Sequence, residues 1–266
     1  MPQLILSEIW IYPVKSLAGI RVKRAMVKQK GLEHDRRWML IDETGRFITQ
    51  REHPEMALFN LSLHNQQLTV TNRKNSQQLT FPVSVPMGQS HQSTIWDDVV
   101  TTIEPSPTYS NWFSAQLGFS CRLVFFPEPN VRNVDTKYVF NQEQVSLADG
   151  YPFLIIGQSS LDDLNSRLKE PVEMKRFRPN FVFTGGEAFE EDNWRNFRVG
   201  STKFKGVKKC ARCVLTTVNP QTGEKGREPL LTLSKYRNTE NKIFFGQNVI
   251  ALGENQIEEG DEITLD

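Results

Sequence analysis

Short runs of apolar and β-branched residues, each ended by a turn signal, recur through most of this 266-residue chain. They are clearest at 58–63, 68–71, 79–81 and 99–103, with a looser polar segment around 88–91. Strands at this regular spacing are typical of an antiparallel meander or a small barrel. We therefore expect a mainly β protein with a few helices, an α+β arrangement in which the strands dominate.

The remaining elements follow the same pattern. An apolar strand is predicted over 4–12, where Pro13 ends it, and others over 20–27, 36–41, 123–126, 153–156 and 181–183. Helices are predicted over 109–117, 161–168 and near 228–236. The Pro-Ser-Pro run at 105–107 marks a joint, so we predict two domains, 1–103 and 104–266.

Charge and cysteine content exclude several classes of protein. Lys plus Arg is 32 against 31 for Asp plus Glu, which argues against a general binder of nucleic acid or acidic membranes. Three cysteines do not suggest a disulfide framework, so a reducing compartment is expected. The N-terminus has no signal-peptide pattern, and no window approaches the roughly 20 apolar residues of a membrane span. We expect a cytoplasmic protein without a membrane span.

Two cysteines two residues apart form the stretch with the clearest chemical potential. Arg212 lies between Cys210 and Cys213, and two lysines precede them at 208–209. Nearby positive charge favours the thiolate, which is the form that attacks substrates or binds metal. The β-branched run at 214–218 predicts a strand that begins directly after Cys213 and ends at Asn-Pro.

Other readings of these cysteines must be weighed. A zinc site needs about four ligands, and the only other cysteine is Cys121. A thioredoxin-type Cys-x-x-Cys opens a helix after a strand, whereas this stretch is predicted to lead into a strand. The residues alone leave two alternatives, a pair of buried structural thiols or a functional thiolate.

Several polar residues stand at predicted strand ends, where an anion is easily bound. An Arg-x-Asn pair, Arg178 and Asn180, opens the strand at 181–183 and should present both side chains on one face of an extended segment. Such a pair can hold a phosphate bidentately and hydrogen-bond a ring edge. Further candidates are Lys15, Ser16, Arg36 and Asp149. A solvated turn is the alternative for Lys15 and Ser16, and a turn former for Asp149.

Taken in order, these motifs resemble those of the MOSC superfamily, specifically its two-part branch that includes the mitochondrial amidoxime-reducing components and their bacterial relatives. The resemblance covers nearly the whole chain and rests on Tyr12-Pro13-Val14-Lys15-Ser16, Asp35-Arg36 before Trp38, Asp149 before Pro152-Phe153-Leu154, Phe177-Arg178-Pro179-Asn180, the run from Cys210 to Val218, and Phe245-Gly246-Gln247. It implies a β-barrel-like MOSC N-terminal domain interlocked with a MOSC β-barrel.

The resemblance also implies a cofactor and the residues that hold it. The family binds molybdenum cofactor, a pterin dithiolene with one terminal phosphate, and supplies a cysteine thiolate to the metal. By resemblance Cys213 is that ligand, and Cys213 and Asp149 are the catalytic residues. The expected cofactor-binding residues are Lys15, Ser16, Arg36, Gly150, Tyr151, Arg178, Asn180, Ala211, Arg212 and Cys213. Gly150, Tyr151 and Ala211 replace small hydroxyl residues of some relatives, so backbone contacts are expected there.

The implied activity is reduction of N-hydroxylated bases, amidoximes and hydroxylamines, a detoxification reaction that needs no pyridoxal phosphate. No cysteine follows Cys213, and an iron–sulfur cluster needs about four. Electrons are therefore expected from a separate flavin or iron–sulfur reductase. The alternative function is a carrier module, in which Cys213 holds a persulfide or hands cofactor to other enzymes.

Overall fold

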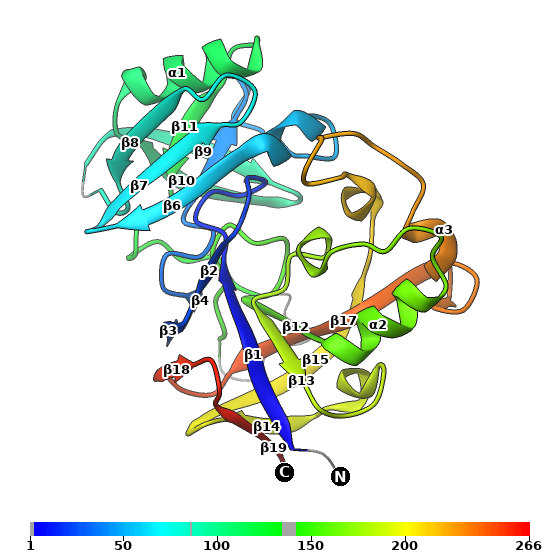
Figure 1. Ribbon diagram of the computed structural model, residues 1–266. Helices are drawn as coiled ribbons and strands as arrows, with labels where there is room; N and C mark the ends of the chain where they lie inside the picture. Colours follow the sequence, from blue (N-terminus) through cyan, green and yellow to red (C-terminus); the bar gives the residue numbers. More distant parts are fainter. Residues whose placement is uncertain (1–2, 86, 135–141) are drawn as a thin grey trace.

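A closed barrel of seven strands forms the larger half of the protein (Figure 1). The computed structural model describes residues 3–85, 87–134 and 142–266. Around the barrel the strands are β12 (Phe153–Gly157), β13 (Phe181–Thr184), β1 (Leu4–Ile11), β19 (Glu262–Leu265), β14 (Asn196–Val199), β15 (Thr202–Ala211) and β17 (Lys242–Ala251). Pairing of β12 with β17 closes the circle, and only β12 and β13 run parallel among these pairs.

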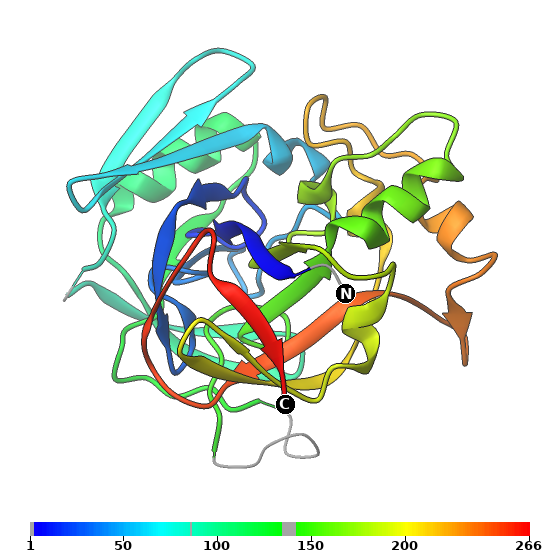
Figure 2. The same ribbon diagram turned by 60° about the horizontal axis from the view of Figure 1, so that its bottom comes forward.

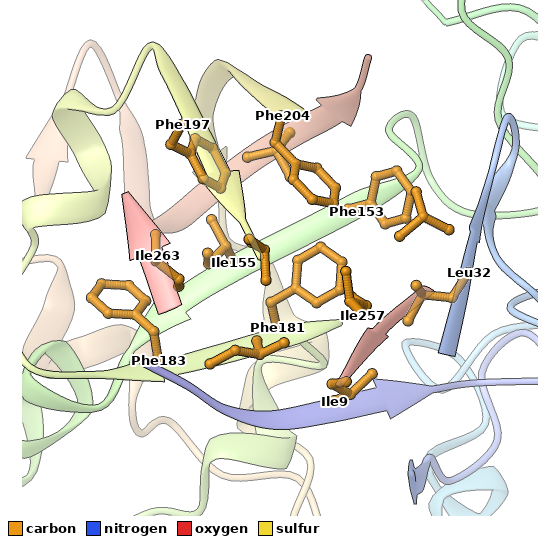
Figure 3. Close-up of a cluster of buried hydrophobic side chains, with 14 of the residues drawn as sticks. Ile9, Leu32, Phe153, Ile155, Phe181, Phe183, Phe197, Phe204, Ile257 and Ile263 are labelled. Carbon is orange, nitrogen blue, oxygen red and sulfur yellow. The ribbon is translucent and has the colours of Figure 1, made fainter. Parts of the chain in front are cut away.

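Aromatic side chains fill the barrel (Figure 3). Phe153, Phe181 and Phe204 contact one another with ring centroids 5.4–5.6 Å apart. Ile257 joins this cluster from β18 (Gln256–Glu258), which pairs with β3 (Arg24–Lys28), itself paired with β4 (Gly31–Leu32). Burial of large aromatic side chains is a main source of stability in such a core, so the strand ends around it are held firmly.

The second half is built from the predicted short strands. An antiparallel meander contains β6 (Phe59–His64), β7 (Gln67–Asn72) and β8 (Gln78–Pro82). A four-stranded sheet contains β5 (Trp38–Ile41), β11 (Arg122–Phe125), β10 (Asp98–Glu104) and β9 (Gln89–Ile95). Trp38 joins the two sheets, because its ring contacts Phe81 at 4.8 Å and Phe125 at 4.9 Å.

The helices lie close to their predicted positions. α1 spans Pro107–Leu117 and begins with Ser106, whose hydroxyl accepts a hydrogen bond from the Thr108 amide at 3.2 Å. α2 (Gln158–Ser166) packs Leu161 and Leu164 against β12 and β13, whereas α3 is short, Leu230–Leu233. A two-stranded ribbon of β16 (Asn238–Thr239) and β17 extends beside α3 (Figure 2).

The two halves interlock. The first strand, β1, lies in the barrel between β13 and β19, and β2 (Ile20–Val22) is paired to it before the chain enters the meander half. Beyond the Pro-Ser-Pro joint, β11 returns to pair with β5 and β10. The predicted boundary near residue 103 remains a prediction, since each half includes strands from both sides of it.

Three local predictions are wrong. The strand expected over 20–27 divides into β2 and β3, which pair with different partners, and residues 89–91 of the looser segment belong to β9. The run at 214–218 forms one turn of 3₁₀ helix, Val214–Thr217, rather than a strand. There the Thr216 and Thr217 hydroxyls donate to the carbonyls of Cys213 and Val214, so local side-chain hydrogen bonds override β propensity.

The buried carboxyl of Glu191 makes stability depend on pH. The Ser160 hydroxyl contacts it at 2.9 Å and the Gly157 amide donates to it at 3.2 Å. Burial raises the pKa of Glu191 to about 7, above the 4.5 of an unfolded glutamate. The folded protein therefore holds the proton more tightly between these values, and stability falls as pH rises through that window.

We predict that Glu191→Gln gains stability relative to the native protein, on the order of 3 kcal/mol, between about pH 5 and pH 8. The measurement is the free energy of unfolding in urea at a series of pH values. Glu187→Gln, a change at an exposed neighbouring carboxylate, is the control. Parallel pH curves for the native protein and Glu191→Gln would contradict the prediction.

Candidate functional site

One cavity between the two halves is lined by all the residues that the sequence places at the site: Lys15, Ser16, Arg36, Asp149, Gly150, Tyr151, Arg178, Asn180, Ala211, Arg212 and Cys213. They come from the ends of β1 and β15, the segments before β12 and β13, and the loop before β5. The structure thus brings them together from distant parts of the sequence. The roles assigned to them remain predictions.

A chain of charged contacts runs across this cavity. Lys15 Nζ lies 2.5 Å from one carboxylate oxygen of Asp149, and Arg51 Nη2 lies 2.6 Å from the other. Arg51 Nε then donates to Cys213 Sγ at 3.3 Å. The Arg51 guanidinium also lies 4.7 Å from the ring of Trp96. Residues of the meander half therefore orient the sulfur and the carboxylate of the barrel half.

This arrangement keeps Asp149 ionised. The Asp149 side chain is about half exposed, at 53%, so the desolvation that would raise its pKa is incomplete. Lys15 and Arg51 outweigh it and hold the pKa of Asp149 well below its usual range. Burial lowers the pKa of Lys15 to about 8, although Asp149 opposes the shift. An ionised carboxylate has no proton to donate, so Asp149 acts in this cavity as a hydrogen-bond acceptor.

Two arginines share one aromatic ring at the back of the cavity. The guanidinium groups of Arg36 and Arg178 lie 4.4 and 4.2 Å from the ring centre of Tyr12. Arg36 pairs with Asp35 at 2.5 Å, but Arg178 donates to the Leu17 carbonyl at 2.6 Å and forms no ion pair with a described carboxylate. Burial lowers the pKa of Arg178 to about 10, which still leaves it charged at neutral pH.

The backbone is strained where these side chains project. Ser16, Arg36 and Arg178 have positive φ values of 67°, 48° and 56°. Non-glycine residues rarely adopt this left-handed conformation, and it is enriched at functional sites. The expectation of an extended Arg-x-Asn segment is therefore wrong at Arg178. Both side chains nevertheless line the cavity.

Asn180 fixes its neighbours from a buried position. Its side-chain oxygen accepts from Arg36 Nη1 at 3.1 Å and from the Leu154 amide at 3.3 Å. Its side-chain nitrogen donates to the Trp10 carbonyl at 3.1 Å. Most of its hydrogen-bonding capacity is thus used within the protein, and its clearest effect is to orient Arg36.

Arg212 lines the cavity and keeps one side-chain donor without a partner among the described residues. Its Nη1 donates to Cys210 Sγ at 3.0 Å and its Nη2 to the Phe177 carbonyl at 2.5 Å. Its Nε is buried and has no hydrogen-bond partner among the described residues. A buried donor without a partner is costly, so an acceptor brought into the cavity would be stabilised there.

Gly150, Tyr151 and Ala211, which replace small hydroxyl residues of some relatives, still border the cavity. A side chain added at Gly150 would meet no atom within 4 Å, so this wall is open. Tyr151 is half-buried, with Lys208 Nζ 4.9 Å from its ring centre. Ala211 ends β15 opposite Phe244. These positions can offer backbone groups and space.

Sequence reasoning missed Arg51, which lies in a polar turn assigned no role. Its contacts are with residues 98 and 162 positions further along the chain. Its only local signal was an arginine in a turn-like segment. Cys213 is followed by a 3₁₀ turn and not by the predicted strand. The predicted strand therefore gives no ground for excluding a dithiol switch at Cys210 and Cys213.

Comparison with known proteins now places the chain. The profile of the MOSC N-terminal beta barrel domain matches residues 3–120, and that of the MOSC domain matches residues 142–264. Mitochondrial amidoxime-reducing component 1 of Mus musculus is 36% identical over 242 residues, covering 87% of this chain and 71% of that protein. The chain belongs to the MOSC family. As expected, it is a mainly β protein with a closed barrel in one half and a match to the family's N-terminal beta barrel domain in the other.

Other relatives of this MOSC protein carry two different names. Mitochondrial amidoxime-reducing component 1 of Homo sapiens is 33% identical over 278 residues, covering 97% of this chain and 82% of that protein. Molybdenum cofactor sulfurase of Oryza sativa subsp. japonica is 32% identical over 289 residues, covering 98% of this chain but 34% of that protein. In the described ranges, every helix falls short of the length and apolar character needed to cross a bilayer.

The three cysteines differ in exposure, which predicts an order of chemical reactivity. Cys213 is exposed, Cys210 is half-buried and Cys121 is buried. Iodoacetamide should therefore alkylate Cys213 first, in electropositive surroundings, and Cys121 only after unfolding. Peptide mass spectrometry during a time course measures this order. Cys213→Ser is the control and should lose the fast phase, whereas a fast phase on Cys121 would contradict the structure.

Proposed function

We propose that this MOSC protein binds molybdenum cofactor and reduces N-hydroxylated compounds with electrons from a separate reductase. One observation carries the proposal: an exposed cysteine sulfur lies in a cavity lined by Lys15 and four arginines, Arg36, Arg51, Arg178 and Arg212. The names of its amidoxime-reducing relatives support the reaction class.

The residues fit such a cofactor. A pterin with a phosphate needs convergent cations and hydrogen-bond donors, which the arginines and Lys15 supply. The buried Arg212 Nε lacks an acceptor among the described residues, and a ligand oxygen would provide one. A sulfur ligand suits a metal that already carries sulfur ligands. The fit rests on the chemistry of these donors.

In this proposal most of the side chains have one task, and Lys15 has two. Cys213 holds the metal, whereas Arg36, Arg178 and Arg212, with Lys15 and Ser16, hold the phosphate and pterin. When bound, the cofactor supplies the two-electron chemistry that, with two protons, converts an N–OH group into N–H and water. Arg51 keeps Cys213 and Asp149 in place.

Lys15 is the proposed proton donor. Its pKa of about 8 suits proton transfer near neutral pH, and Asp149 holds Nζ at 2.5 Å toward the cavity. The ionised Asp149 carboxylate then stabilises the positive charge of the groups it contacts, Lys15 and Arg51. The proposed donor protein is a flavin or iron–sulfur reductase, and a cytoplasmic location remains part of the proposal because of the cysteine content.

The second candidate is a sulfur or cofactor carrier. It is favoured by the exposure of Cys213 beside Arg51 and by the relative named molybdenum cofactor sulfurase. Metal analysis of protein made in cofactor-competent cells separates the two functions. Stoichiometric molybdenum with turnover of an amidoxime by a chemical reductant supports the enzyme. Releasable sulfane sulfur without metal supports the carrier.

Cys213→Ser should abolish molybdenum-dependent turnover, because a serine hydroxyl is a harder and less acidic ligand than a thiol. Cys210→Ser should retain substantial activity, since the Cys210 sulfur is half-buried and accepts a hydrogen bond from Arg212. Amidoxime reduction and molybdenum content are measured in both variants. Equal loss in both, with the fold intact, would indicate a dithiol mechanism.

Arg178→Lys should weaken cofactor retention about tenfold to a hundredfold, because an ammonium cannot reproduce the planar guanidinium fork. The loss corresponds to one charge-assisted hydrogen bond. Molybdenum occupancy after dialysis and the thermal midpoint are measured side by side. Unchanged occupancy with a lowered midpoint would make Arg178 a structural residue of the Tyr12 stack.

A further inference from the structure

A second cavity adjoins the first. Arg178 and Leu215 line both, so the two spaces meet at these side chains. The second cavity is the larger, about 440 Å³ compared with about 140 Å³. It lies between the meander half, which contributes Ala57 and Leu61, and the loop that follows Cys213.

The lining of the second cavity is strongly basic. Arg73, Lys175 and Arg176 line it together with Arg178, and none of the described lining residues is acidic. Lys175 has a counter-charge, because the half-exposed carboxylate of Glu173 lies 2.9 Å from its Nζ. Like charges around a concave surface repel one another and focus a positive potential, which an anion relieves.

Two of these cations are held in place by the protein. Arg73 Nη1 donates to the Pro220 carbonyl at 3.2 Å, and Arg176 Nη1 to the Thr217 carbonyl at 3.4 Å. Both carbonyls belong to the segment after Cys213, so one loop carries the sulfur of the first cavity and orients the cations of the second. Each guanidinium retains further donors for a ligand.

The rest of the lining suits a planar, polar group. Trp10 offers an aromatic surface, and the amides of Gln50, Asn60 and Gln221 offer donors and acceptors. Cations, amides and aromatic rings are the set that recognises a phosphate joined to a heterocycle. A purely apolar ligand would leave these groups unpaired.

We propose that the second cavity binds the phosphate of a nucleotide-like ligand whose other end reaches the first cavity. This deepens the proposed function, on which it rests. The phosphate can come from two sources: an N-hydroxylated nucleotide as substrate, or a nucleotide joined to the phosphate of the cofactor. Both place an anion against Lys175 and Arg176, and the test separates them.

The first measurement is calorimetric titration of the full chain, as purified, with cytidine 5′-monophosphate and with cytidine. The nucleotide should bind at least about tenfold more tightly, which is the effect of one charge-assisted hydrogen bond, and added salt should weaken it. Inorganic phosphate should compete. Equal affinity for nucleotide and nucleoside overturns the proposal.

The double variant Lys175→Gln, Arg176→Gln should lose about tenfold or more in nucleotide affinity and keep its affinity for cytidine. The matched control, Arg24→Gln with Lys203→Gln, removes one arginine and one lysine from exposed strand positions and should bind as the native protein does. Circular dichroism checks the fold of both. A double variant that binds the nucleotide as the native protein does overturns the proposal.

Two further measurements show whether the substrate or the cofactor supplies the phosphate. If the phosphate belongs to the substrate, the double variant keeps its molybdenum and shows a raised KM only for a phosphorylated N-hydroxylated substrate. If the phosphate belongs to a nucleotide joined to the cofactor, the double variant loses molybdenum. Mass spectrometry of cofactor released from the native protein then shows an attached nucleotide. Nucleotide binding without any molybdenum would refute the proposed reductase and leave the second site standing.

Discussion

The burial of Lys15 is the constraint on which the site depends. Only 5% of this residue is exposed, and a buried ammonium needs a counter-charge or must lose its proton. Asp149 supplies that charge from the opposite half of the protein, and Arg51 completes the pairing and contacts Cys213. One buried cation thus connects the packing of the two halves to the position of the sulfur.

Positive charge in the cavity exceeds what the protein itself neutralises. Arg36 has Asp35 and Lys15 has Asp149, but Arg178 and Arg212 are held through carbonyls, a sulfur and aromatic faces. Left-handed backbone at Ser16, Arg36 and Arg178 adds strain at the same place. A fold optimised for stability alone would keep neither feature. The excess positive charge agrees with the anionic cofactor that we propose, and the strain marks the same residues as a functional site.

Local signals predicted the elements well where one cause dominates. Pro13 ends β1 as predicted, because proline restricts the backbone by itself. The Pro-Ser-Pro run was interpreted as a joint, whereas its last two residues begin α1, two residues before the predicted start. Motif order predicted which residues meet at the cavity. The role of Arg51 was not predicted, because a contact across 162 positions leaves no local pattern in the sequence. The left-handed conformation of Arg178 was not predicted either, because its stacking on Tyr12 is a tertiary contact.

The mistaken strand after Cys213 explains why its sulfur is accessible. As a strand, 214–218 would continue β15 alongside β17 and alternate its side chains between core and surface. Instead, Arg212 makes the last ladder contact, to the Ile243 carbonyl at 2.7 Å, and the chain turns. The turn leaves Cys213 exposed and directs the carbonyls of Thr217 and Pro220 toward Arg176 and Arg73. Two threonine hydroxyls that stabilise one 3₁₀ turn therefore shape both cavities.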